Sequence, residues 1–252
     1  MSPQGSKPKL DEKVLTRTPP RRGPEPVAFP LLSMRWERLA MVHWRYDADV
    51  VQRLLPRGLL VDRFEDRAWV SLTPFTMASV RGLGAVALPP AAFPETNLRT
   101  YVRLPDGPSG LWFFSLDVTA PYLLAGRAIG VRYRWADLTV RERGADTFYG
   151  GRRRGAEGVG YRMRIRAGAP VEELSPLDDW LTSRWVALSR GAGLLWLTPV
   201  HHEPWTLRHG TVGELEQTLT RSAGLPDPEP SPLVHVSPGV GPVRLGPSRP
   251  VF

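Results

Sequence analysis

The chain has 252 residues, of which 42% are hydrophobic, so it can bury a sizeable core and is not globally disordered. It has no cysteine, which excludes disulfides and thiolate metal ligands, and its apolar runs are too short for a membrane span. The net charge of +8 is dispersed, with arginine as the basic residue type of most of the chain, a pattern that disfavours nucleic acid as a partner.

The N-terminal segment is basic and proline-rich and shows no hydrophobic periodicity. We therefore expect 1–26 to be a disordered tail and 27–252 to form a single domain. No apolar segment of the kind found in secretory signals follows its basic residues, which favours a cytoplasmic protein without a membrane partner.

Several elements are predicted before the middle of the chain. Residues 31–44 form a long apolar run typical of a strand, and 47–55 has an aspartate cap and an apolar face typical of a short helix. The runs at 59–64 and 68–74 are predicted to form a hairpin, and the glycines and prolines of 81–94 indicate a lid-like loop.

The clearest hairpin is predicted at the centre of the chain. Extended segments at 95–104 and 111–118 flank a Pro-Asp-Gly sequence, which has a defined turn mechanism. A helix with Pro121 in its first turn is expected to follow at 119–129.

The C-terminal half is predicted to combine strands with short helices. Strands are expected near 131–142, 146–152, 159–167, 184–189, 194–200 and 233–236. Ser175 predicts a capped helix over 175–183, and the capping-box spacing of Thr211 and Glu214 predicts another over 211–221. Together the elements favour an α+β fold with a curved antiparallel sheet or partly closed β-barrel and three or four short helices.

A row of alternating polar residues is the most informative feature. Successive side chains of a strand point to opposite faces, so Glu95, Asn97, Arg99 and Tyr101 share one face of the strand at 95–104. These residue types predict one wall of a polar pocket that binds a small molecule. The alternative is a buried structural network in which Glu95 pairs with Arg99 and only fixes the strand geometry.

In the pocket interpretation each side chain has a chemical role. Arg99 would hold a carboxylate with two hydrogen bonds, and Glu95 would be the acid or base if burial raises its pKa. Asn97 and Tyr101 would hydrogen-bond a carbonyl oxygen or an enolate.

Metal and hydrolase chemistry are weakly supported, and no cofactor is predicted. His201 and His202 are adjacent, so they would face opposite sides of a strand and not share a metal ion. Ser115 and Asp117 share a strand face, and His43 or His202 would have to complete a triad with them, but the chain lacks a Gly-x-Ser-x-Gly elbow.

Five segments are familiar in combination: His43–Phe75, ETNLRTYVR (Glu95–Arg103), GLWFFSLD (Gly110–Asp117), LTSRW (Leu181–Trp185) and HEPWTL (His202–Leu207). In this order they resemble the YqjF-like family of domains of unknown function, over about residues 34 to 240. That family is similar in fold to acetoacetate decarboxylase. The resemblance implies a cone-shaped antiparallel β-barrel around a small cavity.

Arg184 and His202, in the last two segments, are added to the candidate substrate-binding residues. Members of the family usually have Thr-Glu-Arg-Tyr where this chain has Thr-Ser-Arg-Trp, at Thr182–Trp185. If the missing glutamate orients the arginine in relatives, another group must orient Arg184 here.

The resemblance also bears on the reaction. Acetoacetate decarboxylase works through a lysine Schiff base, whereas the last lysine of this chain is Lys13. We therefore expect a protein that binds or transforms a small carboxylate or carbonyl compound without a Schiff-base lysine. If it is an enzyme, the expected activity is of the lyase or isomerase type, by acid–base chemistry.

The alternative is a non-catalytic scaffold or interaction module that uses its basic tail and arginine-rich surface. Proteins related in fold are often oligomeric, so a homo-oligomer is also expected.

Overall fold

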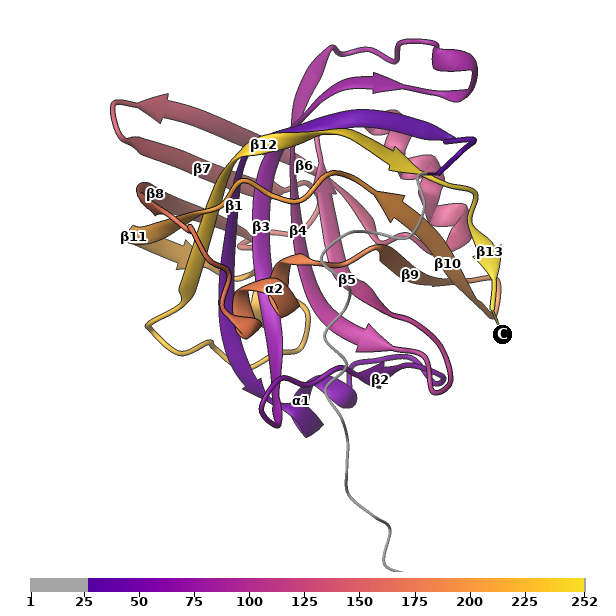
Figure 1. The fold of residues 1–252 in the computed structure, drawn as a ribbon, viewed down its shortest axis with the longest axis horizontal. Coiled ribbons are helices and arrows are strands. Elements are labelled where there is room, and N and C mark those ends of the chain that lie inside the picture. The colour runs from indigo at the N-terminus through magenta and orange to yellow at the C-terminus, as the bar shows by residue number, and fades with distance from the viewer. Residues whose placement is uncertain (1–26, 252) are drawn as a thin grey trace, which may run out of the picture.

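The computed structural model describes residues 27–251, so the tail expected at 1–26 lies outside the described residues. Residues 27–251 form one sheet of 13 strands with a few short helices (Figure 1). None of the helices in this part of the chain has the length and apolar character that crossing a membrane requires.

The strands account for most of the ordered elements. In chain order they are β1 (Leu32–Asp47), β2 (Leu60–Val61), β3 (Arg67–Arg81), β4 (Ala92–Arg103), β5 (Ser109–Val118), β6 (Tyr133–Arg143), β7 (Asp146–Arg153), β8 (Gly160–Pro170), β9 (Val186–Gly191), β10 (Leu194–His201), β11 (Arg208–Gln217), β12 (Leu233–Leu245) and β13 (Arg249–Pro250). The α-helices are α1 (Ala48–Gln52), α2 (Pro176–Thr182) and α3 (Leu219–Ser222), and the 3-10 helices are η1 (Leu83–Ala85) and η2 (Pro121–Ile129).

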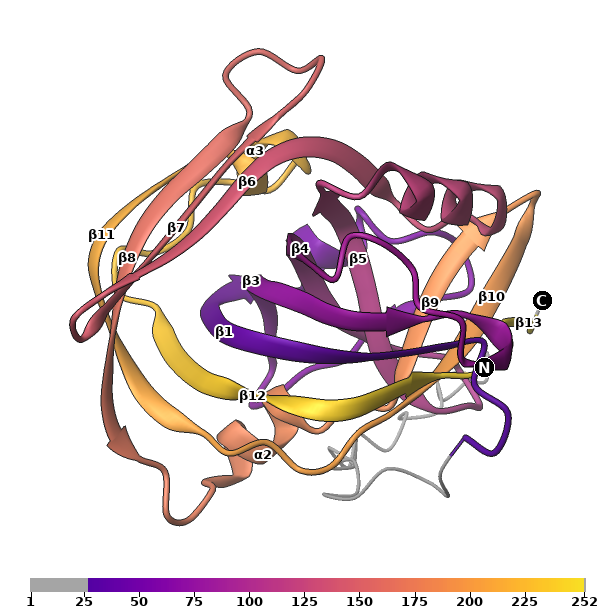
Figure 2. The same ribbon diagram turned by 90° about the horizontal axis from the view of Figure 1, so that it is seen from above.

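The sheet closes on itself twice, so that two rings of paired strands share one wall (Figure 2). The shared wall has the strand order β12-β1-β3-β4-β5. One ring continues from β5 through β6, β7, β8 and β11 back to β12. The other continues from β5 through β9 and β10 back to β12. The expected curved, mostly antiparallel sheet is confirmed, and among the described strands only the β5–β6 and β5–β9 pairs are parallel.

The two rings have different interiors. The ring that contains β6, β7, β8 and β11 encloses an apolar core, in which Leu72 and Leu98 of the shared wall pack in one cluster with Met163 and Ile165 of β8. Each such fully buried side chain contributes about 1.5–3 kcal/mol to folding. The ring that contains β9 and β10 holds a cavity. Strand β4 lies in the shared wall, and both of its faces are buried.

Local sequence signals account for several elements. The β4–β5 hairpin pairs nine residues of each strand around the predicted turn. Helix α2 begins with the predicted capping box, because the Asp178 backbone N–H donates to Ser175 Oγ (3.1 Å) and the Ser175 backbone N–H donates to Asp178 Oδ2 (3.0 Å). The strands β9 and β10 also form the predicted hairpin.

Three sequence-based predictions are wrong. Residues 208–217 form strand β11, not the predicted helix over 211–221, because they pair with β8, and the register shift between Val212 and Glu214 hides the strand alternation. Strand β12 extends to Leu245, well beyond the short strand expected at 233–236. The hairpin predicted from 59–64 and 68–74 is reduced to a single bridge between Phe64 and Arg67, because β2 pairs with β4 instead of β3.

Candidate functional site

The cavity of the second ring has a volume of about 150 Å³. A cavity of this size holds a molecule of about six non-hydrogen atoms. Its walls come from β1, β3, β4, β5, β9 and β10, and the segments that follow η2 and α2 complete them. Most of the lining side chains are aliphatic or aromatic, so the few polar groups among them determine what can bind.

Strand β4 supplies the main polar wall of the cavity. Glu95, Asn97 and Arg99 all line it and are all buried, as the alternation of the strand predicts. Tyr101, the next residue of the row, is completely buried but does not line the cavity. Its ring packs against Trp180 of α2, with 4.6 Å between the ring centroids. The polar row is therefore turned inward, with its last member outside the lining.

Most of the buried polar side-chain atoms that have no hydrogen-bond partner in the described protein belong to residues that line this cavity. They include Thr73 Oγ1, Glu95 Oε2, Asn97 Oδ1, Arg99 Nε and Arg184 Nη2. A buried polar group without a partner costs about 1–3 kcal/mol, so proteins keep few of them. Their concentration at one cavity makes this cavity the candidate functional site.

Arg99 is a buried cation that no carboxylate neutralises. Its Nη2 donates to Met41 Sδ at 3.3 Å, which is a weak acceptor, and the ion pairs of residues 27–251 do not include Arg99. Burial lowers the pKa of Arg99, and the charge and side-chain hydrogen bond of Tyr101 oppose this change. Glu95 does not pair with Arg99, so the alternative structural network expected from the sequence is not formed.

Glu95 is chemically distinct from an ordinary surface carboxylate. Burial, and then the negative charge of Asp117, raises its pKa to about 8. At pH 7 the group is mostly protonated, so it can donate a hydrogen bond or a proton to a ligand. The phenols of Tyr122 and Tyr133 lie close enough that burial and then the Glu95 charge raise the pKa of both.

Arg184 lines the cavity from the segment after α2. Its Nη1 donates to Asp62 Oδ2 at 2.8 Å, and its Nε donates to the carbonyl oxygen of Trp180 at 3.0 Å. The guanidinium also lies over the rings of Trp180 and Tyr101, at 4.3 and 5.0 Å from their centroids. Asp62 is therefore the group that orients Arg184 in the absence of the glutamate usual in the family.

His202 lines the cavity from within a cluster of tryptophans. Its ring centroid lies 4.7 Å from that of Trp205, 4.8 Å from that of Trp185 and 5.7 Å from that of Trp36. Burial lowers the pKa of His202 to about 4, although a hydrogen bond to the backbone of Glu203 opposes the shift. The ring is therefore neutral at pH 7. Because its Nδ1 donates to the Glu203 carbonyl oxygen (2.6 Å), its Nε2 is a hydrogen-bond acceptor.

The residues considered for hydrolase and metal chemistry are not assembled into a site within residues 27–251. His43 lies beside Ser71, with 2.6 Å between Nδ1 and Oγ, and not beside Ser115. Asp117 binds Arg153 and not a histidine, so the considered triad is not formed. Over residues 27–251, no three histidine, aspartate or glutamate side chains are grouped so that they could hold a metal ion.

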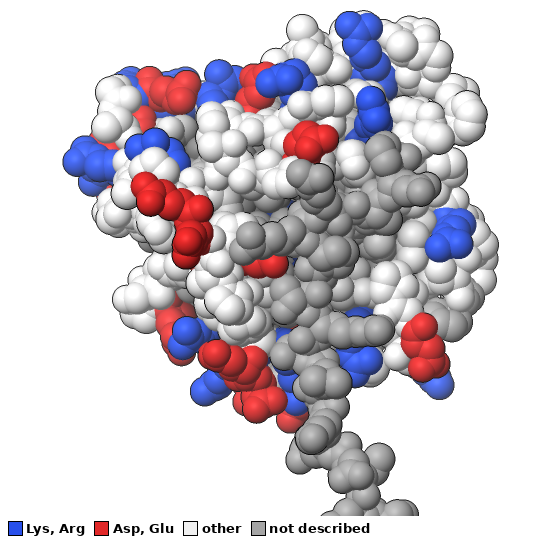
Figure 3. Space-filling model, in the orientation of Figure 1, with Lys and Arg blue, Asp and Glu red and all other residues white. Residues whose placement is uncertain are grey.

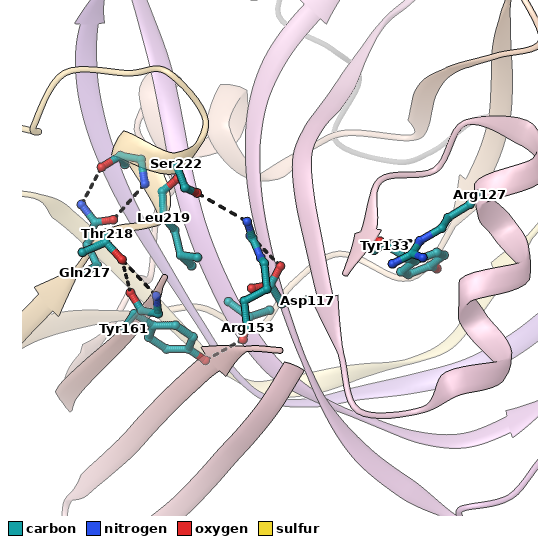
Figure 4. Close-up of polar contacts among 12 residues, drawn as sticks. Asp117, Arg127, Tyr133, Arg153, Tyr161, Gln217, Thr218, Leu219 and Ser222 are labelled. Atoms are coloured by element: carbon teal, nitrogen blue, oxygen red, sulfur yellow. Dashed lines mark hydrogen bonds and ion pairs between the residues drawn. The ribbon is translucent and has the colours of Figure 1, made fainter. Parts of the chain in front are cut away.

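Asp117 instead belongs to a structural network that joins the shared wall to β7, β8 and α3 (Figure 4). Arg153 Nη2 lies 2.8 Å from Asp117 Oδ1, and its Nη1 reaches Ser222 Oγ at 3.5 Å. Nearby, the Tyr161 hydroxyl lies 2.6 Å from Thr96 Oγ1. None of these residues lines the cavity, which separates this network from the candidate site.

Sequence reasoning missed several residues of the site. Thr73 lies directly opposite Asn97 in the β3–β4 pairing, and a polar residue in the apolar run at 68–74 was a usable signal. Trp36 and Tyr133 also line the cavity, but aromatic residues are common in any core. No local pattern marked Asp62 as the partner of Arg184.

The two-ring sheet and its cavity correspond to the acetoacetate decarboxylase-like fold. The chain is similar to the acetoacetate decarboxylase of Legionella pneumophila, with a TM-score of 0.63 and 14% identity, over 88% of this chain and 87% of that one. An acetoacetate decarboxylase-like enzyme of Sphingomonas wittichii RW1 gives a TM-score of 0.58 at 16% identity, over 89% and 94% of the two chains. The enduracididine biosynthesis enzyme MppR, solved with pyruvate, gives 0.58 at 14% identity, over 90% and 92%. At such identities the likeness concerns the fold alone.

The sequence comparisons define the family. The chain belongs to the DUF2071 family, described as an uncharacterized conserved protein, whose model matches residues 33–241. It is 32% identical over 214 residues to the uncharacterized protein YqjF of Bacillus subtilis (strain 168), which covers 81% of this chain and 86% of that protein. The resemblance found in the sequence segments is thereby confirmed.

Proposed function

We propose that this protein binds a small carboxylate that also has a carbonyl group, and acts on it by acid–base chemistry in the cavity. The observation that supports this proposal is Arg99, a buried guanidinium that lines the cavity and has no carboxylate partner within residues 27–251. A buried cation of this kind is stabilised most by an anion with which it can form charge-assisted hydrogen bonds. The Nη2 of Arg184, for which the described part of the chain also offers no partner, is a second donor for such an anion.

Glu95 is the proposed acid or base. It lies four residues from Arg99 on the same face of β4, so a ligand carboxylate on Arg99 would direct the rest of a small molecule along the strand toward Asn97 and Glu95. The protonated Glu95 would donate to a carbonyl oxygen, and its conjugate base would accept a proton from the adjacent carbon. Such a pair of steps is proton transfer next to a carbonyl, as in an isomerase or a lyase.

The proposed chemistry does not use a lysine Schiff base. The cavity lining that residues 27–251 provide includes no lysine, since the three lysines of the chain are Lys7, Lys9 and Lys13. Arginine, tyrosine and asparagine side chains do not form the iminium ion that such catalysis requires. The similar fold of acetoacetate decarboxylases therefore supports a cavity for a small molecule without supporting their covalent mechanism.

Pyruvate is a suitable first probe, because it combines a carboxylate with a ketone in six non-hydrogen atoms and because the structurally similar MppR was solved with it. Isothermal titration calorimetry with pyruvate, and then with acetoacetate and other small oxo acids, tests the proposal. We expect Arg99→Met to weaken binding at least tenfold. Arg103→Met, a change of the same type at the end of the same strand and outside the cavity, is the matched control.

Proton transfer has a separate assay. Nuclear magnetic resonance in D2O measures deuterium exchange at the carbon next to the ketone, and Glu95→Gln should abolish the exchange that the wild-type protein catalyses. If the protein binds an oxo acid but does not catalyse exchange, the acid–base part of the proposal is wrong and only the binding function remains. If no small oxo acid binds the wild-type protein, or if Arg99→Met binds as well as the wild type, the proposal is wrong.

The scaffold alternative has little structural support. Several exposed arginines pair with neighbouring carboxylates, such as Arg154 with Asp137 and Arg166 with Asp146. On the face shown in Figure 3, positive and negative side chains are mixed. The role of the basic segment 1–26 is tested by its deletion and a pull-down at two salt concentrations, since electrostatic binding weakens steeply with salt.

A further inference from the structure

Five buried side chains form a continuous line of polar contacts beside the cavity. Asp178 Oδ1 lies 2.9 Å from His235 Nε2, and His235 Nδ1 lies 3.2 Å from His43 Nε2. His43 Nδ1 lies 2.6 Å from Ser71 Oγ, which in turn lies 2.8 Å from the Tyr101 hydroxyl. We refer to these five residues as the histidine chain. All five are buried, and His43, Ser71, Tyr101 and His235 are completely so.

The contacts of Asp178 determine which atom donates and which accepts in each hydrogen bond of the histidine chain. Burial raises the pKa of Asp178, but hydrogen bonds from His235 and Ser175 outweigh it and lower the pKa to about 2, so the carboxylate is ionised and only accepts. His235 Nε2–H therefore donates to Asp178. In a neutral His235 the other nitrogen, Nδ1, then accepts from His43 Nε2–H.

The donors and acceptors between His43 and Tyr101 are assigned in the same way. Burial lowers the pKa of His43 well below its usual value and the positive charge of Arg99 adds to this change, so this ring is neutral. Its Nδ1 accepts from the Ser71 hydroxyl, and Ser71 Oγ accepts from the Tyr101 hydroxyl. Each donor points toward Asp178, which leaves the lone pairs of the Tyr101 oxygen free to accept.

Arg99 lies two residues before Tyr101 on β4 and is the direct cross-strand neighbour of Ser71, which receives the Tyr101 proton. A side-chain hydrogen bond from the guanidinium to Tyr101 raises the pKa of Arg99. A hydroxyl that accepts can hold a guanidinium, whereas a hydroxyl that donates toward it repels it.

We propose that the histidine chain positions Arg99, by holding the Tyr101 oxygen as an acceptor toward the guanidinium. This inference rests on the carboxylate site proposed above and assigns positioning roles to residues outside the cavity lining.

Within residues 27–251, few charged groups face the histidine chain. Asp178 of α2 faces His235, while Arg99 and Tyr101 of β4 face His43. Arg184 lies over the Tyr101 ring. Of these, only Asp178 directly contacts the histidine pair with a negative charge, so Asp178 sets the direction of the chain.

The substitution Asp178→Asn tests this assignment. Asp178 Oδ2 accepts from both the backbone N–H and the hydroxyl of Ser175, so the asparagine oxygen must occupy that side to keep the helix cap. Its NH₂ group then faces His235 and must donate, which forces both histidines into the opposite tautomer. Nitrogen-15 resonances of the imidazoles report this directly. We expect Nε2–H tautomers for His43 and His235 in the wild type, and Nδ1–H tautomers in the variant.

The nuclear magnetic resonance signal of the Arg99 Nε–H group reports the position of this side chain. The Arg99 Nε–H resonance, assigned by its loss in Arg99→Met, should shift and exchange faster with solvent in both Asp178→Asn and Tyr101→Phe. Pyruvate affinity should fall at least tenfold in each, and the double variant should lose no more than either single variant. Asp179→Asn, the same change at the next residue of α2, leaves the histidine chain intact and is the control.

Two results would overturn the inference. One is an Nδ1–H tautomer of His43 or His235 in the wild-type protein. The other is an Asp178→Asn variant with reversed tautomers and an unchanged Arg99 signal. If the Arg99 signal responds as expected but neither pyruvate nor any other oxo acid binds the wild type, the positioning role holds and the proposed ligand is wrong.

Discussion

The Asp62 carboxylate binds Arg184 at 2.8 Å, although 122 residues separate the two in the sequence. This pair contrasts with Arg99 and Arg132, which line the same cavity and form no ion pair with a carboxylate of residues 27–251. Of the three arginines in the lining, Arg184 is thus the one that a described carboxylate neutralises. Asp62 therefore reduces the unbalanced positive charge around the cavity.

The contribution of this ion pair is measurable as stability. Replacing Asp62 by asparagine leaves the Arg184 guanidinium buried without its counter-charge, and we expect the free energy of unfolding to fall by about 3 kcal/mol. Urea denaturation measures the loss. The control is Asp137→Asn, which breaks the exposed ion pair with Arg154 and should leave the midpoint unchanged. Equal stability of both variants would show that Asp62 does not neutralise Arg184.

Glu95 gives a prediction about pH. Its pKa is raised to about 8 in the folded protein, from an ordinary value of 4.5, so between these values the folded state binds a proton that the unfolded state does not. Stability from this group is therefore fully present below pH 4.5 and is lost as pH rises toward 8, at about 1 kcal/mol per pH unit. The lowered pKa of His202 acts in the opposite direction, but only between pH 4 and 6.5.

Between pH 6.5 and 8, the change of stability with pH is therefore expected to come from Glu95 and not from His202. Denaturation at several pH values in this range should show a decline for the wild type and a flatter curve for Glu95→Gln, which cannot ionise. A wild-type curve that rises over this range, or a variant with the same slope, would contradict the raised pKa.

A third prediction concerns covalent chemistry. Treatment with acetoacetate and borohydride should leave no reduced adduct on residues 27–251, because all three lysines precede them. Intact mass and peptide mapping would detect the adduct, and a genuine Schiff-base decarboxylase treated in parallel is the positive control. A stoichiometric adduct at a single lysine that disappears on unfolding would refute the prediction.

A fourth prediction concerns the close contact between β9 and Gly130, which directly follows η2. Gly130 has a φ of +78°, and a Cβ added there would lie 2.0 Å from the Arg190 carbonyl oxygen of β9. Gly144 also has a positive φ, of +60°, but a Cβ there meets nothing within 4 Å. We expect Gly144→Ala to lower the melting temperature by about 2–4 °C, from backbone strain alone.

Gly130→Ala adds a steric clash to the same strain, so its loss should be at least twice as large. It should also weaken pyruvate binding, because Gly130 lines the cavity. Similar melting temperatures for the two variants would mean that β9 can move away from η2 without cost.

The sequence predicted those features that depend on neighbouring residues. Strand alternation placed Glu95, Asn97 and Arg99 on one face, and the Ser175 cap marked the start of α2. The prediction for 211–221 was wrong because a capping-box spacing also occurs by chance in a strand, and the irregular pairing at Gly213 removed the alternation that would have corrected it.

Features that depend on distant contacts could not be predicted. The contact between His43 and His235 joins residues 192 positions apart, and only the pairing of β1 with β12 brings them together. The long β12 was missed for a similar reason. Its prolines argue against a strand locally, but pairing with β1 along most of its length outweighs them.

Strand β4 lies in the wall that the two rings share, and its alternating side chains face either the cavity of one ring or the apolar core of the other. Odd-numbered positions 95, 97 and 99 meet the cavity, whereas even-numbered positions such as Leu98 and Val102 hold the apolar core of the other ring. Homologues can therefore exchange the odd positions and acquire a new ligand preference without repacking that core. A single-residue insertion before Glu95, in contrast, would exchange the environments of the two sets and impair folding and recognition together.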